Sequence, residues 1–193
     1  MSEIILASTS PRRRELLAQI GVRFRQQVAE IDETPLHNEP AQDYVVRLAL
    51  VKARAVHRQQ GDTGALVLGA DTAVVVDGQI LGKPADAAAA RSMLRLLSGR
   101  RHSVFSAIAL VGAHEAVEVN ESHVWFRPLS DAEIAAYWRS GEPADKAGGY
   151  GIQGLGAIFI ERLEGSYSGV MGLPLYETAR LLRAFGIKIL DQS

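Results

Sequence analysis

The chain has 193 residues, a length that suits one domain or two tightly fused lobes, and its 47% hydrophobic and 22% charged residues are ordinary for a soluble globular protein. The formal net charge of −1 lacks the basic excess of proteins that bind nucleic acid or anionic membranes, so we expect neither partner. The absence of cysteine excludes disulfides, thiolate metal sites and a cysteine nucleophile, and it favours a cytoplasmic protein.

The chain opens with a pattern typical of a strand, a polar loop and a helix. Residues 4–7 form a short apolar run, which predicts a buried strand. Ser10 then stands where an N-cap belongs, and Pro11 takes the first helical position. The helix is predicted to continue to residue 20, because Gly21 ends it.

The rest of the chain alternates between helical and extended patterns. Asp77-Gly78 between two apolar runs predicts a two-residue hairpin of type I′, and Ser130 with Glu133 predicts a capping box. Further helices are predicted over residues 41–57, 85–97, 131–140 and 174–185, and strands over residues 66–70, 74–76, 79–81, 104–111, 117–126 and 158–160. This alternation with one clear hairpin favours an α/β protein with a mixed, twisted sheet flanked by helices.

The loop that follows the first strand has the features of an anion-binding site. Backbone N–H groups and the positive end of the helix dipole attract negative charge at such a place. The hydroxyls of Ser8 and Ser10 and the consecutive arginines 12–14 add donors and fixed charge. Cations at a helix N-terminus oppose the dipole, a cost that a bound polyanion would offset. The pattern therefore favours phosphate binding over a plain N-cap beside a solvated basic turn.

Asp71 is the first candidate for chemistry elsewhere in the chain. It follows the predicted strand 66–70, and ligands bind at the strand ends of open α/β sheets. A carboxylate there can deprotonate a water or hold Mg²⁺, or it can be a simple turn residue. Glu33 belongs to an acidic cluster that either supplies a metal ligand or forms a solvated loop. Lys52 and Lys83 are each either phosphate ligands or solvated lysines.

Residues 149–154 read Gly-Tyr-Gly-Ile-Gln-Gly and match the dinucleotide pattern G-x-G-x-x-G in letters alone. The true fingerprint follows a strand and opens a helix, whereas here a polar loop precedes and a strand is predicted to follow. The glycines are better explained by a tight bend or by a backbone that approaches a flat ligand. Gln153 can donate and accept a hydrogen bond, which suits the edge of a base.

Taken in order along almost the full chain, these segments resemble the Maf family of nucleotide pyrophosphatases. The resemblance rests on residues 6–17, Gly69-Ala70-Asp71-Thr72, Gly82-Lys83-Pro84, residues 142–154 and Gly172-Leu173-Pro174. It implies a single domain over residues 1–193, with two lobes around a central cleft as in inosine triphosphate pyrophosphatases. It also implies a divalent cation, Mg²⁺ or Mn²⁺, and a homodimer.

The resemblance also implies roles for individual residues. The family's general base corresponds to Asp71, and Glu33 is the candidate carboxylate for the metal. The phosphate-binding positions correspond to Ser8, Ser10, Arg13, Lys52 and Lys83. The family's dTTP/UTP type is marked by three further positions, which here are Arg12, Thr72 and Gln153.

The resemblance therefore implies that the chain hydrolyses dTTP and UTP, or modified pyrimidine nucleotides, to the monophosphate and pyrophosphate. The alternative is a nucleotide-binding regulator of cell division that acts through a protein partner and does not turn its nucleotide over. Asp71 favours the enzyme, because pure binding does not need a general base.

Overall fold

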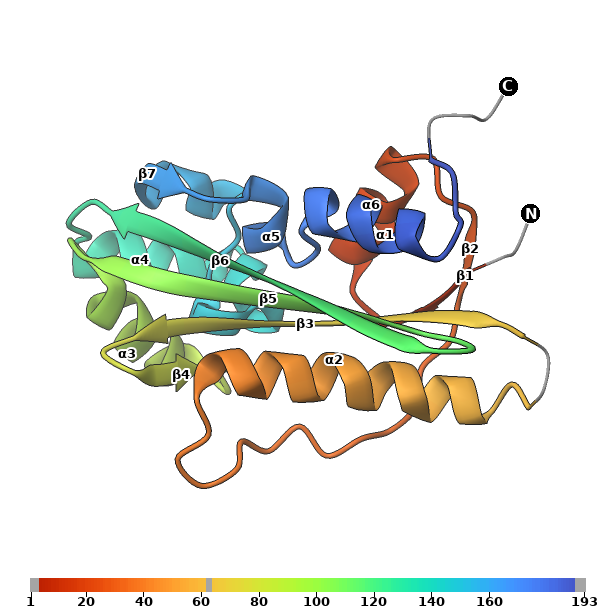
Figure 1. The fold of residues 1–193 in the computed structure, drawn as a ribbon. Coiled ribbons are helices and arrows are strands. Elements are labelled where there is room, and N and C mark those ends of the chain that lie inside the picture. Colours follow the sequence, from red (N-terminus) through yellow and green to blue (C-terminus); the bar gives the residue numbers. More distant parts are fainter. Residues whose placement is uncertain (1–3, 62–63, 190–193) are drawn as a thin grey trace. The chain divides into compact units, whose positions relative to one another are not determined.

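The computed structural model describes residues 4–61 and 64–189, which form a seven-stranded sheet with helices packed against it (Figure 1). The chain divides into two compact units. The first comprises Met1–Asp71, Ser106–Asn120 and Gly172–Ser193, and the second comprises Thr72–Phe105 and Glu121–Met171. Across the described ranges, every helix is too short or too polar to span a bilayer.

The sheet is mixed, which confirms the predicted α/β class. Its strand order is β2 (Phe24–Gln26), β1 (Ile4–Ala7), β3 (Leu66–Val76), β5 (Arg101–Val111), β6 (Glu115–Phe126) and β7 (Ile160–Glu164), and β4 (Gln79–Leu81) also pairs with β3. β1 runs parallel to β2 and β3, whereas the β3–β4 and β6–β7 pairs are antiparallel. Parallel strands are buried on both faces, which explains why all of β1 is apolar and buried.

In the first unit, helices cover both sides of β1 and β3. Figure 1 shows α2 (Ala41–Arg58) on one side, and α1 (Pro11–Gln19) and α6 (Leu175–Ala184) on the other. Gly69 in β3 lets α2 approach closely, because a Cβ atom there would lie 2.2 Å from the backbone oxygen of Ala49. Side chains of β1, such as Leu6, and of α2, such as Leu48, are fully buried in this layer.

The second unit has its own apolar core under α3 (Ala87–Leu97) and α4 (Asp131–Arg139). Three 3₁₀ helices (Glu142–Asp145, Ala147–Gly149 and Leu155–Phe159) and the short α5 (Tyr167–Met171) complete it. The core comprises Val74, Val76, Leu81, Leu94, Leu97, Val104, Val124, Phe126, Ile134, Tyr137, Tyr150 and Phe159.

The structure confirms the predicted hairpin turn and capping box. Asp77 and Gly78 both have positive φ, as a type I′ turn requires, and they join Val76 to Gln79. Both hydrogen bonds of the capping box between Ser130 and Glu133 are present at the start of α4.

Several predicted strand boundaries are wrong. The strands predicted to begin at residues 104 and 117 begin at Arg101 and Glu115. β3 does not end at residue 70 but continues through Asp71 to Val76, because the apolar residues after Thr72 keep it in the sheet. The strand predicted over 158–160 begins only at Ile160, since residues 158–159 belong to a 3₁₀ helix. The short β2 and α5 were not predicted, because three and five residues carry too little periodicity.

The close approach of α2 to β3 at Gly69 leads to a prediction about stability. Gly69→Ala places a methyl group against backbone atoms of α2, which cannot move aside independently, so the free energy of unfolding should fall by about 1–3 kcal/mol. Urea unfolding measures this difference. Gly82→Ala is the control, because a Cβ at Gly82 meets no atom within 4 Å. Equal stability of the two variants would contradict the close packing.

Candidate functional site

The loop between β1 and α1 is organised by its two serines. Ser10 is the N-cap of α1, and its Oγ accepts a hydrogen bond from the backbone N–H of Arg13 at 3.5 Å. The N–H of Ser10 in turn donates to the Oγ of Ser8 at 3.2 Å. Pro11 occupies the first turn, as the sequence predicted. The loop therefore has a defined conformation at the positive end of the helix.

Arg13 is held at this loop by two contacts. Its Nε donates to the backbone oxygen of Gly172 at 2.9 Å, and its Nη1 donates to the Oγ of Ser8 at 3.2 Å. Burial lowers the pKa of Arg13, while the charge of Asp71 acts in the opposite direction. A guanidinium fixed in this way is ready to bind an anion without first losing side-chain entropy.

Asp71 lies inside β3 and not at its end. β1 pairs with β3 only as far as Ala7, opposite Gly69, and the chain then leaves the sheet as the Ser8 loop. Asp71 stands just beyond this last pair, and its carboxylate contacts Lys52 of α2. Only 7% of the residue is exposed. Ligands usually bind where a strand of an open α/β sheet ends. Here the strand that ends is β1, and Asp71 lies just beyond that point in the neighbouring β3.

Lys52 from α2 neutralises this buried carboxylate. Its Nζ lies 2.6 Å from Oδ1 of Asp71. Burial raises the pKa of Asp71, and the nearby Lys52 and Arg13 counteract that rise. Asp71 can therefore still ionise, but it binds a proton more tightly than an exposed aspartate does.

Glu33 joins the same cluster from the loop before α2. Its Oε1 lies 3.0 Å from the Nζ of Lys52, so two carboxylates converge on one ammonium group. Within residues 4–61 and 64–189, no group of three or more His, Cys, Asp or Glu side chains could hold a metal. A carboxylate pair still suits Mg²⁺, which commonly takes one or two carboxylates together with waters and substrate phosphates.

Tyr44 of α2 is a further residue of the site, and it is not among the positions predicted from the sequence. Its hydroxyl donates to the backbone oxygen of Glu33 at 3.0 Å. Burial, and then the charges of Asp71 and Glu33, raise the pKa of Tyr44 to about 12. Tyr44 therefore stays a neutral hydrogen-bond donor and holds the backbone of the acidic loop.

The remaining predicted positions belong largely to the second unit. Arg12 is half-buried in the first turn of α1, and Thr72 directly follows Asp71 in β3. Lys83 is exposed after β4, where the oxygen of the preceding Gly82 accepts the N–H of Gly148 at 3.0 Å. Gln153 is exposed in a turn. The 149–154 segment begins at the last residue of one 3₁₀ helix and ends just before the next, so it lacks the strand-to-helix context of a dinucleotide fingerprint.

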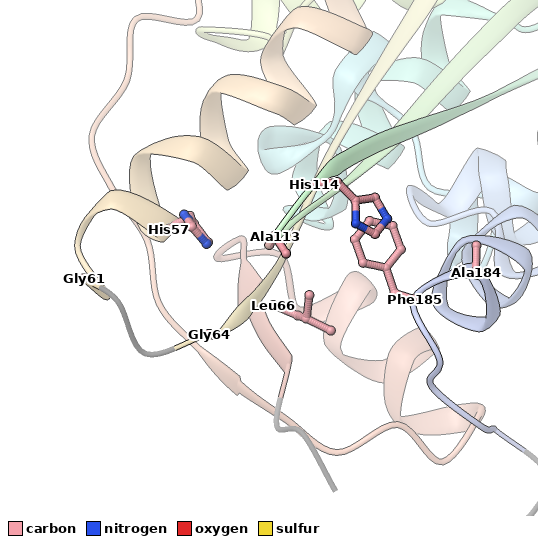
Figure 2. A pocket seen from close by; sticks show the side chains of 9 residues that line it. His57, Gly61, Gly64, Leu66, Ala113, His114, Ala184 and Phe185 are labelled. Atoms are coloured by element: carbon pink, nitrogen blue, oxygen red, sulfur yellow. The ribbon is translucent and has the colours of Figure 1, made fainter.

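A separate hollow of about 620 Å³ lies elsewhere in the first unit (Figure 2). His57 at the end of α2, Leu66 at the start of β3, and His114 and Phe185 line it. Figure 2 shows the rings of His114 and Phe185 together; they stack, and their centroids are 4.1 Å apart. None of the residues with a predicted role lines this hollow.

The fold and the site define an α/β protein in which a loop at a helix N-terminus, with Arg13 fixed beside it, accompanies a buried, charge-paired carboxylate. The family model of the Maf-like proteins matches residues 3–185, and the chain belongs to this family. Two relatives named dTTP/UTP pyrophosphatase come from Hahella chejuensis, 56% identical over 96% of this chain and 94% of that protein, and from Aromatoleum aromaticum, 52% identical over 96% of each. Among solved structures, a HAM1 protein from Coxiella burnetii is similar with a TM-score of 0.47 and 24% identity, over 65% of this chain and 73% of that chain.

The charge pair at the centre of the site gives a second prediction. Lys52→Met removes the ammonium and leaves the Asp71 carboxylate buried without this counter-ion. The pKa of Asp71 should then rise further, and the free energy of unfolding should fall by about 3 kcal/mol. Because the folded variant binds this proton more tightly than the folded wild type, the loss should grow as the pH rises above the already raised pKa of Asp71 in the wild type.

Carboxyl ¹³C NMR titration of Asp71 and urea unfolding at several pH values measure both effects. Arg54→Met on the same helix is the matched control, because Arg54 pairs with Glu115 at a half-exposed position. That variant should change stability by less than about 1 kcal/mol and leave the titration of Asp71 as it is. An unchanged Asp71 titration in Lys52→Met would show that the pair does not control this carboxylate.

Proposed function

We propose that the protein hydrolyses dTTP and UTP to the nucleoside monophosphate and pyrophosphate. Its relatives at 50–56% identity are named dTTP/UTP pyrophosphatase, which places the chain among nucleoside triphosphate pyrophosphatases. The observation that carries the proposal is the pairing of Asp71 with Lys52, beside a fixed arginine and a helix N-terminus. A site of this kind combines a base with positive charge for a polyphosphate.

The phosphate groups are proposed to bind at the loop between β1 and α1. The N-terminus of α1 supplies its dipole, and Arg13 supplies a guanidinium whose Nε and Nη1 are already held in place. Charged hydrogen bonds to phosphate oxygens are stronger than neutral ones, so this loop can stabilise the charge that develops on the leaving pyrophosphate.

Asp71 is proposed to act as the general base. It takes a proton from a water molecule, and the water oxygen forms a bond to the α-phosphorus as the bond from that phosphorus to the α–β bridging oxygen breaks. The electron pair of the broken bond leaves with pyrophosphate. A carboxylate with a raised pKa is a stronger proton acceptor than an ordinary aspartate, and Lys52 keeps it ionised for the task.

A divalent cation, Mg²⁺ or Mn²⁺, is also part of the proposal. Glu33 and Asp71 would hold it, because their oxygens already converge on a single cationic group. When bound, such an ion neutralises charge on phosphate oxygens and polarises the phosphorus centre.

The remaining roles are proposed from the family resemblance. Lys83 is a phosphate ligand, and Arg12, Thr72 and Gln153 select the pyrimidine base. Hydrogen bonding to one base can exclude another strongly, because a mismatch leaves buried polar groups without partners. The cytoplasmic location and the homodimer stay predictions.

A panel of nucleoside triphosphates with Mg²⁺ or Mn²⁺ tests the function, provided that pyrophosphate and orthophosphate are resolved. We expect pyrophosphate together with the monophosphate from dTTP and UTP. Release of orthophosphate alone would contradict attack at the α-phosphorus. Tight binding of dTTP without any turnover would instead support the regulator of cell division.

Replacement of the proposed base gives a kinetic prediction. Asp71→Asn keeps the shape of the side chain but removes its basicity, so kcat should fall by roughly 10²- to 10⁴-fold. Steady-state kinetics with dTTP measures the loss. The wild-type rate should also decline with falling pH at a higher pH than an ordinary aspartate would give, because burial raises the pKa of Asp71.

The control for this variant is Asp77→Asn, at the exposed hairpin turn where Asp77 pairs with Arg100. Its turnover should match that of the wild type. Turnover by Asp71→Asn close to the wild-type value would remove Asp71 from the role of base.

A further inference from the structure

Gln153 lies in a tight turn whose two ends are tied to one pair of side chains. The N–H of Gly154 donates to the oxygen of Gly151 at 3.4 Å and closes the turn, and Gln153 itself is exposed. At one end, the N–H of Gly151 donates to the hydroxyl oxygen of Tyr137 at 3.1 Å. At the other end, the N–H of Leu155 donates to Oε2 of Glu142 at 2.7 Å.

Glu142 is the centre of this arrangement. Besides Leu155, its carboxylate accepts the hydroxyl of Tyr137 at 2.7 Å and the N–H of Gly156 at 3.1 Å. Burial favours the neutral acid, but the hydrogen bonds from Tyr137 and from the two backbone N–H groups outweigh it and leave the pKa of Glu142 lowered. Glu142 is therefore an anion with three donors in fixed directions, all of them on or next to the segment that bears Gln153.

The glycines of the segment let this carboxylate come close. A Cβ atom at Gly154 would lie 2.3 Å from Oε2 of Glu142, and one at Gly156 would lie 2.6 Å from the hydroxyl oxygen of Tyr137. Gly154 has φ −116°, which any residue can adopt, so only the contact with Glu142 requires a glycine there. The glycine at position 154 is thus explained by a backbone packed against a carboxylate.

We propose that Glu142 is a positioning residue for base selection: its carboxylate sets the backbone of residues 151–156 and thereby the place of Gln153. This inference rests on the proposed function, because it assigns Gln153 to the pyrimidine edge. Glu142 does not need to touch the nucleotide. A purely structural glutamate would affect stability, whereas a positioning residue affects the choice among bases through Gln153.

Glu142→Gln is the first test. A glutamine has an NH₂ group where one carboxylate oxygen accepted, so an N–H donor would face another donor and the turn must shift. We expect the preference for dTTP over dCTP, as a ratio of kcat/KM, to fall roughly tenfold. The change should be mostly a higher KM for dTTP, with kcat within about threefold of the wild type. The reason is that the pyrimidine ring of the nucleotide is distant from the phosphoanhydride bond that breaks.

Two further variants separate positioning from stability. Gly154→Ala should lose the preference for dTTP in the same way, because its methyl group would clash with the Glu142 carboxylate and displace the turn. Glu133→Gln is the matched control: it also removes a carboxylate that accepts backbone and side-chain hydrogen bonds in the second unit, at the capping box of α4. It should lower thermal stability and leave the dTTP/dCTP ratio unchanged.

The decisive comparison is a double-mutant cycle with Gln153→Ala. If Glu142 acts through Gln153, the double variant should discriminate no worse than Gln153→Ala alone. Independent, additive losses would overturn the proposal, and so would a full dTTP preference in Glu142→Gln and Gly154→Ala. Gly154→Ala alone decides the matter if Glu142→Gln does not fold.

These outcomes are distinct from failure of the proposed function. If the wild type releases no pyrophosphate from dTTP or UTP, the proposed function itself fails and this inference falls with it. If the wild type prefers dTTP and Gln153→Ala abolishes that preference while Glu142→Gln keeps it, the enzyme assignment stands and only the role of Glu142 is wrong.

Discussion

Lys52 and Asp71 form a mostly buried ion pair, and the charged side chains of the candidate site in the first unit gather around it. A carboxylate at this depth must be charge-paired or protonated, and the ammonium 2.6 Å away from α2 provides the pairing. The contact requires α2 to lie close against β3, which the absence of a side chain at Gly69 permits. The Lys52 ammonium also contacts the Glu33 carboxylate, so one positive charge pairs with two acidic residues from different segments.

Both units hold their polar segments in place with a few directed hydrogen bonds. In the first, the guanidinium of Arg13 is held between Ser8 and the backbone of Gly172. In the second, the carboxylate of Glu142 holds the turn that bears Gln153. Such contacts reduce the entropy that binding would otherwise cost, and in both places the ligand is expected to meet an ordered surface.

Features that depend on neighbours in the sequence were predictable. The N-cap Ser10 and the hairpin at Asp77-Gly78 follow from which residues can accept a backbone hydrogen bond or adopt positive φ, and the structure confirms them. The position of Asp71 inside a continuous strand could not be predicted, since a polar pair such as Asp71-Thr72 usually interrupts an apolar run. The pairing of that carboxylate with Lys52, from a helix distant in the sequence, offsets the cost of burying it inside the strand.

The sequence by itself determined the α/β alternation, the N-cap of the first helix and the family, because these depend on residue types at short spacings. The tertiary structure decided which charges meet: that Lys52 lies between Glu33 and Asp71, and that Arg13 reaches Gly172. It also assigned Glu142 to the glycine-rich turn. The physical reason is that hydrogen bonds and ion pairs act over about 3 Å in space, and residues distant along the chain come that close only when the sheet and its helices are packed.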